Sequence, residues 1–408
     1  MEDRYLFTSE SVTEGHPDKL CDRISDGILD AYLKRDPDAR VACETTVTTG
    51  LITVMGQITS RASVDIQGVV REIVKEVGYI DDRFGFNGEN CGVIVMVDRQ
   101  SEDIRAGVGC SLEKRNRQRS LTLGGGDMKE DPYDQVGAGD QGMMFGYACL
   151  ETRSLMPAPI YYAHQLCKRM SFVRKNHHLR YLGPDGKAMV TFEYVEGRPE
   201  RIHTIVLSAQ HTADVDQERI RNDLIAKVIH PVVPEKLLTD TEILINPSGR
   251  FVYGGPAADT GLTGRKIVVD TYGGTGRHGG GAFSGKDPTK VDRTGAYAAR
   301  YIAKNIVAAD IAERCEVQIA YAIGVAKPVS VHVDTYGTGK YGDNVISRMV
   351  METFDLRPAY LIDHFDMRKP IYKKLAAYGH FGRVEWELAW EKKDMVEAIR
   401  AYFAAGKG

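Results

Sequence analysis

Helix and strand patterns alternate along the whole chain, and this alternation is what most limits the folds available to it. The patterns form three blocks. The first has predicted helices at 17–35 and 66–77, a strand at 93–97 and two strands within 40–60. The second has helices at 160–175 and 218–229 and strands at 190–195 and 202–207. The third has a helix at 296–312 and strands at 266–270, 317–322 and 329–333. We therefore expect an α/β (α+β) fold whose sheets are covered by helices on one side.

The composition is that of a globular protein with two or three domains. Of 408 residues, 43% are apolar and 27% are charged. The net charge of −3 gives no reason to expect nucleic acid or an acidic membrane surface as the main partner. No apolar run approaches the ~20 residues that a membrane span needs, and the first residues show no signal-peptide pattern. We expect a cytoplasmic protein.

The seven cysteines contain no C-x-x-C pair, and their number is odd. This pattern predicts reduced thiols rather than disulfides or a zinc site.

A glycine-rich stretch at 279–293 resembles a phosphate-binding loop but departs from it at one position. Residues 280–286 fit the spacing G-x-x-x-x-G-K, in which backbone N–H groups surround phosphate oxygens. The next residue should be Ser or Thr, and here it is Asp287, which argues against a common kinase or ATPase loop. The stretch still gathers Lys286, Lys290 and Arg293 for a polyphosphate, with Asp292 as a possible metal ligand. The sequence therefore predicts an unusual phosphate site.

A second polar cluster, at 9–19, precedes the first predicted helix. Pro17 fits the first helical position, which puts His16 at the N-cap and Asp18 in the first turn. Helix capping explains Asp18 but not the whole cluster. Aspartates also recur every four residues along this helix, at 18, 22, 26 and 30. Like charges at this spacing cost ~0.2–0.5 kcal/mol per pair, so Lys19 and Arg23, or a bound cation, could offset them.

Residues 101–136 form a long irregular stretch with five glycines and the basic run at 114–119. Structureless loops longer than ~12–15 residues are usually lids, binding loops or linkers. Two interpretations stay open: a solvated linker, or a lid over a polyanion.

Glycine spacings elsewhere predict turns rather than a dinucleotide-binding fold. Three matches to G-x-G-x-x-G begin at 137, 274 and 337, and none has the strand, helix and acidic residue that a Rossmann motif requires. The pentapeptide Val-Asp-Thr-Tyr-Gly occurs at 269–273 and at 333–337. Five residues do not decide between duplication and chance.

Three motifs together resemble the signatures of the S-adenosylmethionine synthetase family: residues 15–19, 137–142 and 279–287. The resemblance runs in family order over nearly the whole chain. It implies three similar domains around a pseudo-threefold axis, at 1–101, 137–247 and 248–408, with a gating loop at 102–136. It also implies the family reaction, in which methionine sulfur attacks C5′ of ATP and displaces tripolyphosphate, which is then cleaved to phosphate and pyrophosphate. Two Mg²⁺ per site, one K⁺ per subunit, and homodimers or homotetramers with shared active sites are further implications.

The resemblance also assigns roles to individual residues. It implies that His16, Lys187, Arg265 and Lys286 are catalytic, with His16 contacting the leaving-group oxygen. The implied ATP contacts are His16, Asp140, Asp185, Lys187, Arg250, Phe251, Asp259, Arg265, Lys266, Ala282 and Lys286, and Phe251 is expected to stack on adenine. The implied methionine contacts are Gln57, Gln100, Asp259 and Lys290. The implied metal ligands are Asp18 and Asp292 for Mg²⁺ and Glu44 for K⁺.

The chain departs from the family pattern in two places. Gln57 stands where the family usually has a glutamate that binds the methionine ammonium group, and the gating loop is longer and more basic than expected. The leading hypothesis is a working synthetase. A non-catalytic, nucleotide-binding or regulatory paralogue is the alternative, favoured by Gln57 alone. A P-loop kinase is disfavoured by Asp287.

Overall fold

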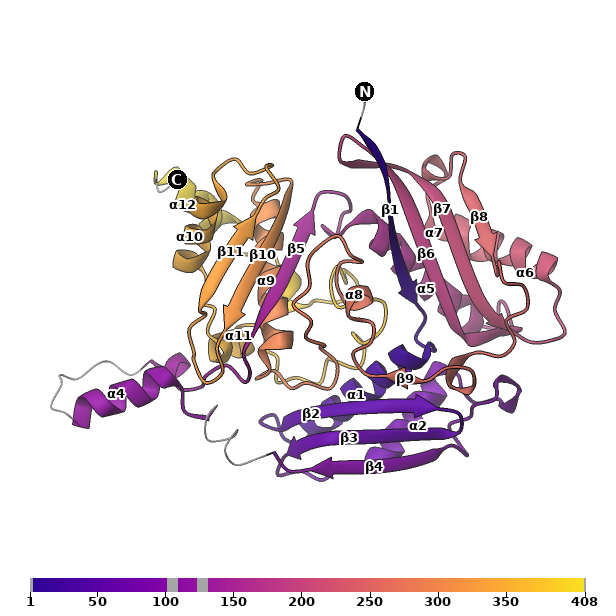
Figure 1. Cartoon of the computed structure of the whole chain (residues 1–408), viewed down its shortest axis with the longest axis horizontal. Helices are drawn as coiled ribbons and strands as arrows, with labels where there is room; N and C mark the ends of the chain where they lie inside the picture. Colours follow the sequence, from indigo (N-terminus) through magenta and orange to yellow (C-terminus); the bar gives the residue numbers. More distant parts are fainter. Residues whose placement is uncertain (1–2, 101–108, 123–130, 407–408) are drawn as a thin grey trace.

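The computed structural model describes residues 3–100, 109–122 and 131–406. Part of the expected gating loop, at 102–108 and 123–130, lies outside the described residues. The described part contains three sheets arranged around a central region that holds α8 (Ile267–Asp270) (Figure 1). Every helix within the described ranges is too short or too polar to span a bilayer.

The elements repeat a similar order three times. The first third of the chain contains β1 (Arg4–Val12), α1 (Pro17–Leu33), β2 (Arg40–Thr48), β3 (Leu51–Thr59), α2 (Ile66–Val77) and β4 (Gly92–Asp98). After α4 (Leu112–Thr122), the middle third contains β5 (Gly142–Cys149), α5 (Ala158–Lys175), β6 (Leu182–Val195), β7 (Arg198–His211), α6 (Gln217–Leu224), α7 (His230–Val232) and β8 (Glu242–Ile245). The last third contains β9 (Gly261–Leu262), α8, α9 (Val291–Ala308), β10 (Arg314–Tyr321), β11 (Ser330–Asp334), α10 (Asp343–Thr353), α11 (Pro358–His364) and α12 (Val396–Ala404).

Each third gives its first strand to the sheet of another third. The sheet orders are β4-β3-β2-β9, β1-β6-β7-β8 and β11-β10-β5. Thus β1 pairs antiparallel with β6, β5 with β10, and β9 with β2. We call this the cyclic strand exchange. Because it pairs strands that are far apart in the sequence, the exchange links each third of the chain to another (Figure 1).

Most predicted elements are confirmed, and three differ from their predictions. Residues 266–270 were expected to form a strand but form the short helix α8. The helix expected at 296–312 begins earlier, at Val291, and ends at Ala308. The stretch expected to be irregular contains α4, which extends away from the rest of the molecule (Figure 1). The repeated pentapeptide has no common structure, because Val269 is helical and Val333 lies in β11.

Helix α2 shows how local sequence determines an element. Asp65 at its N-cap accepts a hydrogen bond from Gly68 N at 2.9 Å. Gly78 ends the helix with a left-handed φ of 111°, which glycine adopts without strain. Between these caps, Val70, Ile73 and Val77 share one buried face, and Ile73 lies beside Gly27 of α1.

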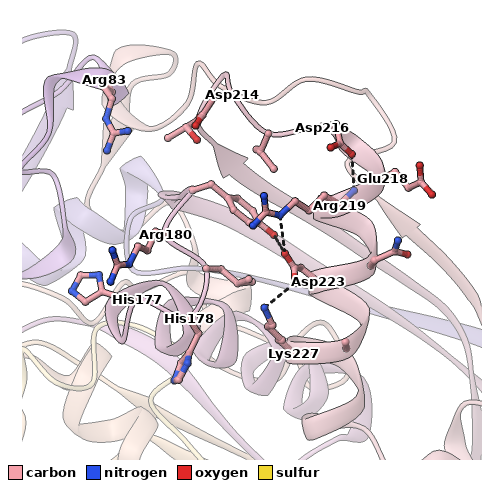
Figure 2. A pocket seen from close by; sticks show the side chains of 16 residues that line it. Arg83, His177, His178, Arg180, Asp214, Asp216, Glu218, Arg219, Asp223 and Lys227 are labelled. Atoms are coloured by element: carbon pink, nitrogen blue, oxygen red, sulfur yellow. Dashed lines mark hydrogen bonds and ion pairs between the residues drawn. The ribbon is translucent and has the colours of Figure 1, made fainter.

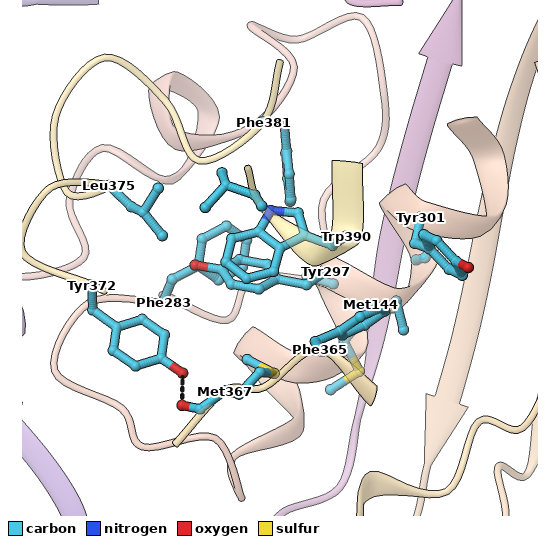
Figure 3. Close-up of a cluster of buried hydrophobic side chains, with 14 of the residues drawn as sticks. Met144, Phe283, Tyr297, Tyr301, Phe365, Met367, Tyr372, Leu375, Phe381 and Trp390 are labelled. Atoms are coloured by element: carbon cyan, nitrogen blue, oxygen red, sulfur yellow. Dashed lines mark hydrogen bonds between the residues drawn. The ribbon is translucent and has the colours of Figure 1, made fainter. Parts of the chain in front are cut away.

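A buried aromatic cluster packs against α9 and the sheet β11-β10-β5. Trp390 lies flat on Tyr297, with ring centroids 4.2 Å apart (Figure 3). Phe283 joins the cluster edge-on to Tyr297 at 5.6 Å and is only 2% exposed. Phe283 belongs to the glycine-rich stretch, so this cluster anchors that stretch to the core.

A buried histidine in α5 predicts a pH dependence of stability. His164 Nδ1 lies 2.8 Å from Ser11 Oγ, and Nε2 is unpartnered among the described residues. Burial, with the positive charges of Arg383 and Lys19, lowers the pKa of His164 to about 3 from its ordinary 6.5. The unfolded chain therefore binds a proton more readily below pH 6.5, and folding stability falls as pH drops through that value.

We expect His164→Asn to lessen this loss. Asparagine retains a polar group near Ser11 but does not titrate. Between pH 7.5 and 5, the unfolding free energy of the wild type should fall by about 2 kcal/mol more than that of the variant. Urea denaturation at the two pH values measures this difference, and carboxyl groups common to both proteins cancel. Equal falls in the two proteins would contradict the prediction.

Candidate active site

His16 lies at the N-cap of α1, as the sequence predicts. The amide N–H of Asp18 donates to His16 Nδ1 at 3.2 Å. Burial, together with the positive charges of Lys266 and Lys187, lowers the pKa of His16 to about 3. The ring is therefore neutral near pH 7, and because Nδ1 accepts a hydrogen bond, its proton is on Nε2. His16 retains one N–H donor for a bound group.

Four aspartates, one per turn, form a stripe along α1, and backbone amides from the C-terminal third bind all four. We call this the aspartate stripe. The donors are Leu262 N to Asp18 at 3.0 Å, Gly264 N to Asp22 at 2.9 Å, Gly285 N to Asp26 at 2.8 Å, and Tyr372 N and Lys373 N to Asp30 at 2.9 Å each. Because a helix rises about 5.4 Å per turn, the stripe holds these segments at regular intervals.

Side chains offset part of the like charge of the stripe. Lys19 Nζ donates to Asp22 at 2.7 Å, as the sequence suggested. Arg23 was expected to act likewise, but it contacts Glu14 instead. Arg293 NH2 donates to both oxygens of Asp26, at 2.9 and 2.7 Å. Asp22 and Asp26 therefore have counter-charges within the protein and need no metal ion to balance them.

The predicted phosphate-binding cations gather around Asp18 and His16. Lys266 Nζ lies 2.6 Å from Asp18 Oδ2, and Arg265 Nε lies 3.7 Å from Asp18 Oδ1. Although burial raises the pKa of Asp18, the hydrogen bonds from Lys266 and from Leu262 N bring it below its ordinary value. Lys187 comes from β6, opposite the last residue of β1. The group concentrates positive charge beside one ionised carboxylate.

The glycine-rich stretch runs along the part of the β2 edge that β9 leaves unpaired, which explains Asp287. Cys43 N donates to Gly285 O at 2.9 Å, and Asp287 N donates to Val41 O at 3.0 Å. Asp287 Oδ2 in turn accepts from Val41 N at 2.9 Å and from Lys290 Nζ at 2.6 Å. The residue that breaks the P-loop pattern thus anchors the stretch to the first sheet. The sequence carries no signal for this role, because Val41 lies 246 residues away.

Lys286 and Asp292, both predicted site residues, form an ion pair at 2.5 Å. Gly281 passes so close to Asp292 that a Cβ there would lie 2.3 Å from the carboxylate carbon. A Cβ on Gly264 would lie 2.6 Å from the Ala282 methyl carbon. Close packing of Gly264 on the Ala282 methyl group therefore brings the segment of Lys266 next to that of Lys286.

Asp140 follows a glycine that touches the same region. Gly139 N donates to Thr289 O at 3.2 Å, next to Lys290, and Asp140 Oδ1 accepts from Gln141 N at 2.7 Å. The glycine motif at 137–142 therefore marks a close approach of two backbone segments and not a dinucleotide site.

Arg293 is a correction to the sequence analysis. The glycine-rich stretch predicted it as a polyphosphate contact, but its side chain is fully buried. It pairs with Asp26, donates to Lys286 O at 2.9 Å and lies 4.4 Å from the ring centre of Tyr372. Arg293 therefore supports the backbone of Lys286 from the buried interior.

Gln57, Glu44 and Lys286 lie on the face of the first sheet opposite α1 and α2. Ala42 pairs with Gln57 on one side and with Lys286 on the other, and directly paired residues point to the same face. With strands ~4.8 Å apart, the Cα atoms of Gln57 and Lys286 are about 10 Å apart. Glu44 is two residues along β2 and exposed. Gln100 N donates to Thr59 Oγ1 at 3.2 Å, at the end of the same strand as Gln57.

The segment of Arg250 and Phe251 is held to β7 by His211. His211 N donates to Phe251 O, and Phe251 N donates to His211 Nε2, both at 3.0 Å. Phe251 is half-buried, and Arg250 is exposed.

Asp185 fixes the next part of this segment. Its Oδ2 accepts from Gly255 N at 2.8 Å, while Oδ1 is buried and unpartnered among the described residues. Burial raises the pKa of Asp185 to about 6, although Gly255 N–H and Lys187 oppose the rise. Asp259 follows on the surface, with Oδ1 accepting from Thr260 N at 2.8 Å. Asp185 is therefore a buried carboxyl with one oxygen available.

A cavity of about 1080 Å³ lies elsewhere, between the end of α5 and α6. Three of its charged side chains pair with each other, as Figure 2 shows: Asp223 with Lys227 at 2.8 Å and with Arg219 at 3.7 Å. None of the predicted site residues lines it. We therefore assign the candidate active site to the cluster around His16 and Lys286.

Comparisons with known proteins agree with the motifs. The N-terminal, central and C-terminal domain models of S-adenosylmethionine synthetase match residues 4–102, 135–251 and 253–392. An S-adenosylmethionine synthase from Desulforudis audaxviator (strain MP104C) is 58% identical over 406 residues, which cover 99% of each chain. The chain belongs to the S-adenosylmethionine synthetase family.

Proposed function

We propose that this chain is a methionine adenosyltransferase that forms S-adenosylmethionine, phosphate and pyrophosphate from ATP, methionine and water. The observation that carries the proposal is the meeting of His16, Lys266 and Lys286 with two carboxylates, Asp18 and Asp292, through segments far apart in sequence. A thioether sulfur needs no base, so the protein must align it with C5′ and stabilise the departing triphosphate.

In the proposed reaction, the methionine sulfur forms a bond to C5′ while the bond from C5′ to the triphosphate oxygen breaks. The electron pair leaves with the triphosphate. His16, neutral and with its proton on Nε2, donates a hydrogen bond to the leaving oxygen. Lys187, Arg265, Lys266 and Lys286 stabilise the charge that accumulates there. Water then splits the bound tripolyphosphate into phosphate and pyrophosphate.

Mg²⁺ and K⁺ are the cations we propose for this site. Asp18 and Asp292 fit Mg²⁺, because carboxylate oxygens suit this ion. Each carboxylate pairs with a lysine, and a phosphate oxygen could replace the carboxylate as the partner of that lysine. Bound Mg²⁺ supplies positive charge to the phosphate oxygens. Glu44, exposed on the sheet face of Gln57, fits a K⁺ ligand.

For the substrates, we propose that Phe251 stacks on adenine and that Arg250, Asp185, Asp259, Asp140 and Ala282 complete the ATP site. Gln57, Gln100, Asp259 and Lys290 would hold methionine. Lys290 now pairs with Asp287 at 2.6 Å and must exchange that contact.

We also propose self-association as a homodimer or homotetramer through the sheet faces not covered by helices. Exposed apolar side chains stand on all three faces: Leu6, Met189, Met143, Ile94 and Met96. Gln57 and Glu44 open onto one of these faces, so a second copy would enclose them. Light scattering gives the mass of the assembly in solution.

Product analysis tests the proposed function. The protein is incubated with ATP, methionine, Mg²⁺ and K⁺, and the products are identified by mass spectrometry with parallel phosphate and pyrophosphate assays. We expect S-adenosylmethionine with equal amounts of phosphate and pyrophosphate. Bound but unreacted ATP would refute the proposal and support a non-catalytic paralogue, whereas phosphoryl transfer to an acceptor would support a kinase.

Gln57→Glu is expected to lower the KM for methionine about fivefold, with little change in kcat. A charged hydrogen bond is worth ~1.5–3 kcal/mol and a neutral one ~0.5–1.5 kcal/mol, so the carboxylate should gain about 1 kcal/mol on the ammonium group. Steady-state kinetics at saturating ATP measure both constants. Identical KM values in the two proteins would exclude a contact between Gln57 and the ammonium group.

A further inference from the structure

The backbone on both sides of Lys286 is held by one buried ion pair. Asp26 accepts the N–H of Gly285, the residue before Lys286, at 2.8 Å. Arg293 donates to the carbonyl of Lys286 itself, at 2.9 Å. Asp26 and Arg293 bind each other at 2.7 Å, and both side chains are fully buried. The pair therefore holds the peptide group that precedes Gly285 and the peptide group that follows Lys286, one on each side of the lysine.

The turn held by this pair has little freedom in other directions. Gly285 has a φ of 79°, and a Cβ there would lie 1.8 Å from the carbonyl oxygen of Cys43. Phe283 is buried in the aromatic cluster, and Asp287 is fixed to β2. Only the side chain of Lys286, which is 27% exposed, projects from this fixed backbone.

The same arrangement recurs one turn earlier on α1. Asp22 accepts Gly264 N at 2.9 Å, just before Arg265 and Lys266, and its counter-charge is Lys19. Two cation-bearing segments are thus held by two successive aspartates of the stripe. The repetition indicates that α1 sets where phosphate-binding cations stand relative to His16.

We propose that Asp26 and Arg293 are positioning residues for Lys286, required for departure of the triphosphate more than for binding ATP. This inference rests on the proposed function. Neither side chain reaches the surface, so both act through the turn. A buried ion pair is often no more stabilising than apolar groups of similar volume. A contribution to folding stability is therefore a weak explanation for the presence of this pair.

The test removes the charges together. In Asp26→Asn/Arg293→Met, asparagine still accepts the Gly285 N–H, but nothing donates to the Lys286 carbonyl, and no buried charge is left unpaired. The matched control is Glu391→Gln/Arg300→Met/Lys304→Met, which removes the buried contacts that Arg300 and Lys304 of the same helix, α9, make with Glu391 at 3.1 and 2.5 Å, away from the site. Kinetic constants, per folded protein, are measured beside urea unfolding and hydrogen exchange of the 285–287 amides.

We expect kcat to fall about 10–100-fold in Asp26→Asn/Arg293→Met, since a misplacement of a catalytic group by ~1 Å can cost that much. KM for ATP should change less than threefold, exchange at 285–287 should quicken, and the control should keep its kcat. A kcat equal to that of the control would overturn the proposal. If this variant does not fold, Arg293→Lys is the deciding test, because lysine keeps the positive charge on a shorter side chain. A reduced kcat with retained stability supports the positioning role, and an unchanged kcat refutes it. A wild type that forms no S-adenosylmethionine refutes the proposed function itself, whereas an active wild type beside an unaffected variant refutes only this inference.

Discussion

Lys286→Met is expected to lower kcat for S-adenosylmethionine formation by about 10³-fold. At an effective dielectric near 20, an opposite charge at ~4 Å is worth ~4 kcal/mol, and each 1.36 kcal/mol lost from the transition state costs about tenfold in rate. Lys286 projects from a backbone fixed by Asp26, Arg293 and the edge of β2. Because this backbone is fixed, a shift of the neighbouring chain cannot easily bring another positive charge to the position of the Lys286 side chain.

Initial rates at saturating ATP and methionine measure the effect. Folding should be little affected, because the partner Asp292 is still 19% exposed and can be hydrated. Lys369→Met is the control, since Lys369 is 67% exposed and pairs only with Asp366 at the surface among the described residues. A loss of less than tenfold in Lys286→Met would show that this lysine does not stabilise the leaving group.

His16→Asn is expected to lower kcat about 10²–10³-fold with little change in KM for ATP. Removing one donor from developing negative charge typically costs that much. Asparagine is as good an N-cap as any residue and keeps an acceptor for Asp18 N, so α1 should stay intact. What the variant lacks is the N–H at the position of Nε2.

A matched variant separates capping from catalysis. In His16→Gln, the amide extends to the region of Nε2 and should recover part of the rate. Comparison of kcat and thermal unfolding for the two variants tests this. If His16→Asn retained kcat within fivefold of the wild type, His16 would be a helix cap only.

Local signals in the sequence were sufficient for elements that have their own caps and periodicity. Pro17 places the start of α1, and Asp65 and Gly78 bound α2. The wrong predictions lie where tertiary contacts overrule local preference. The apolar run at 266–270 favours a strand, but Lys266 is bound to Asp18 and Asp270 to Lys19, and between these contacts the chain forms one helical turn.

Two other differences have equally physical causes. The start of α9 is polar and contains Gly295, which hides the helical pattern. A Cβ at Gly295 would lie 3.1 Å from Tyr321 and 3.2 Å from Met144, so the glycine is there for close packing on the sheet. Helix α4 lacks apolar periodicity, and tertiary contacts hold its first turn, where Glu113 accepts backbone N–H groups of Ala326 and Lys327.

The motifs contain the charged residues of the candidate site, but they do not indicate which residues hold that site in place. Asp26 and Arg293 are 267 residues apart, and Asp287 and Val41 are 246 apart. No periodicity or spacing links positions so distant. A single sequence therefore gives the chemistry of this site more readily than its support.

The cyclic strand exchange has a consequence for synthesis on the ribosome. Strand β1 emerges first, but its partner β6 begins at residue 182, so at roughly 5–20 residues per second β1 waits on the order of 10–30 s. Strand β5 likewise waits for β10, which begins at residue 314. The sheet of the first third also stays incomplete after that third has been made, because its fourth strand, β9, begins at residue 261. The nascent protein therefore carries exposed strand edges until late in translation, and such edges can pair with other chains.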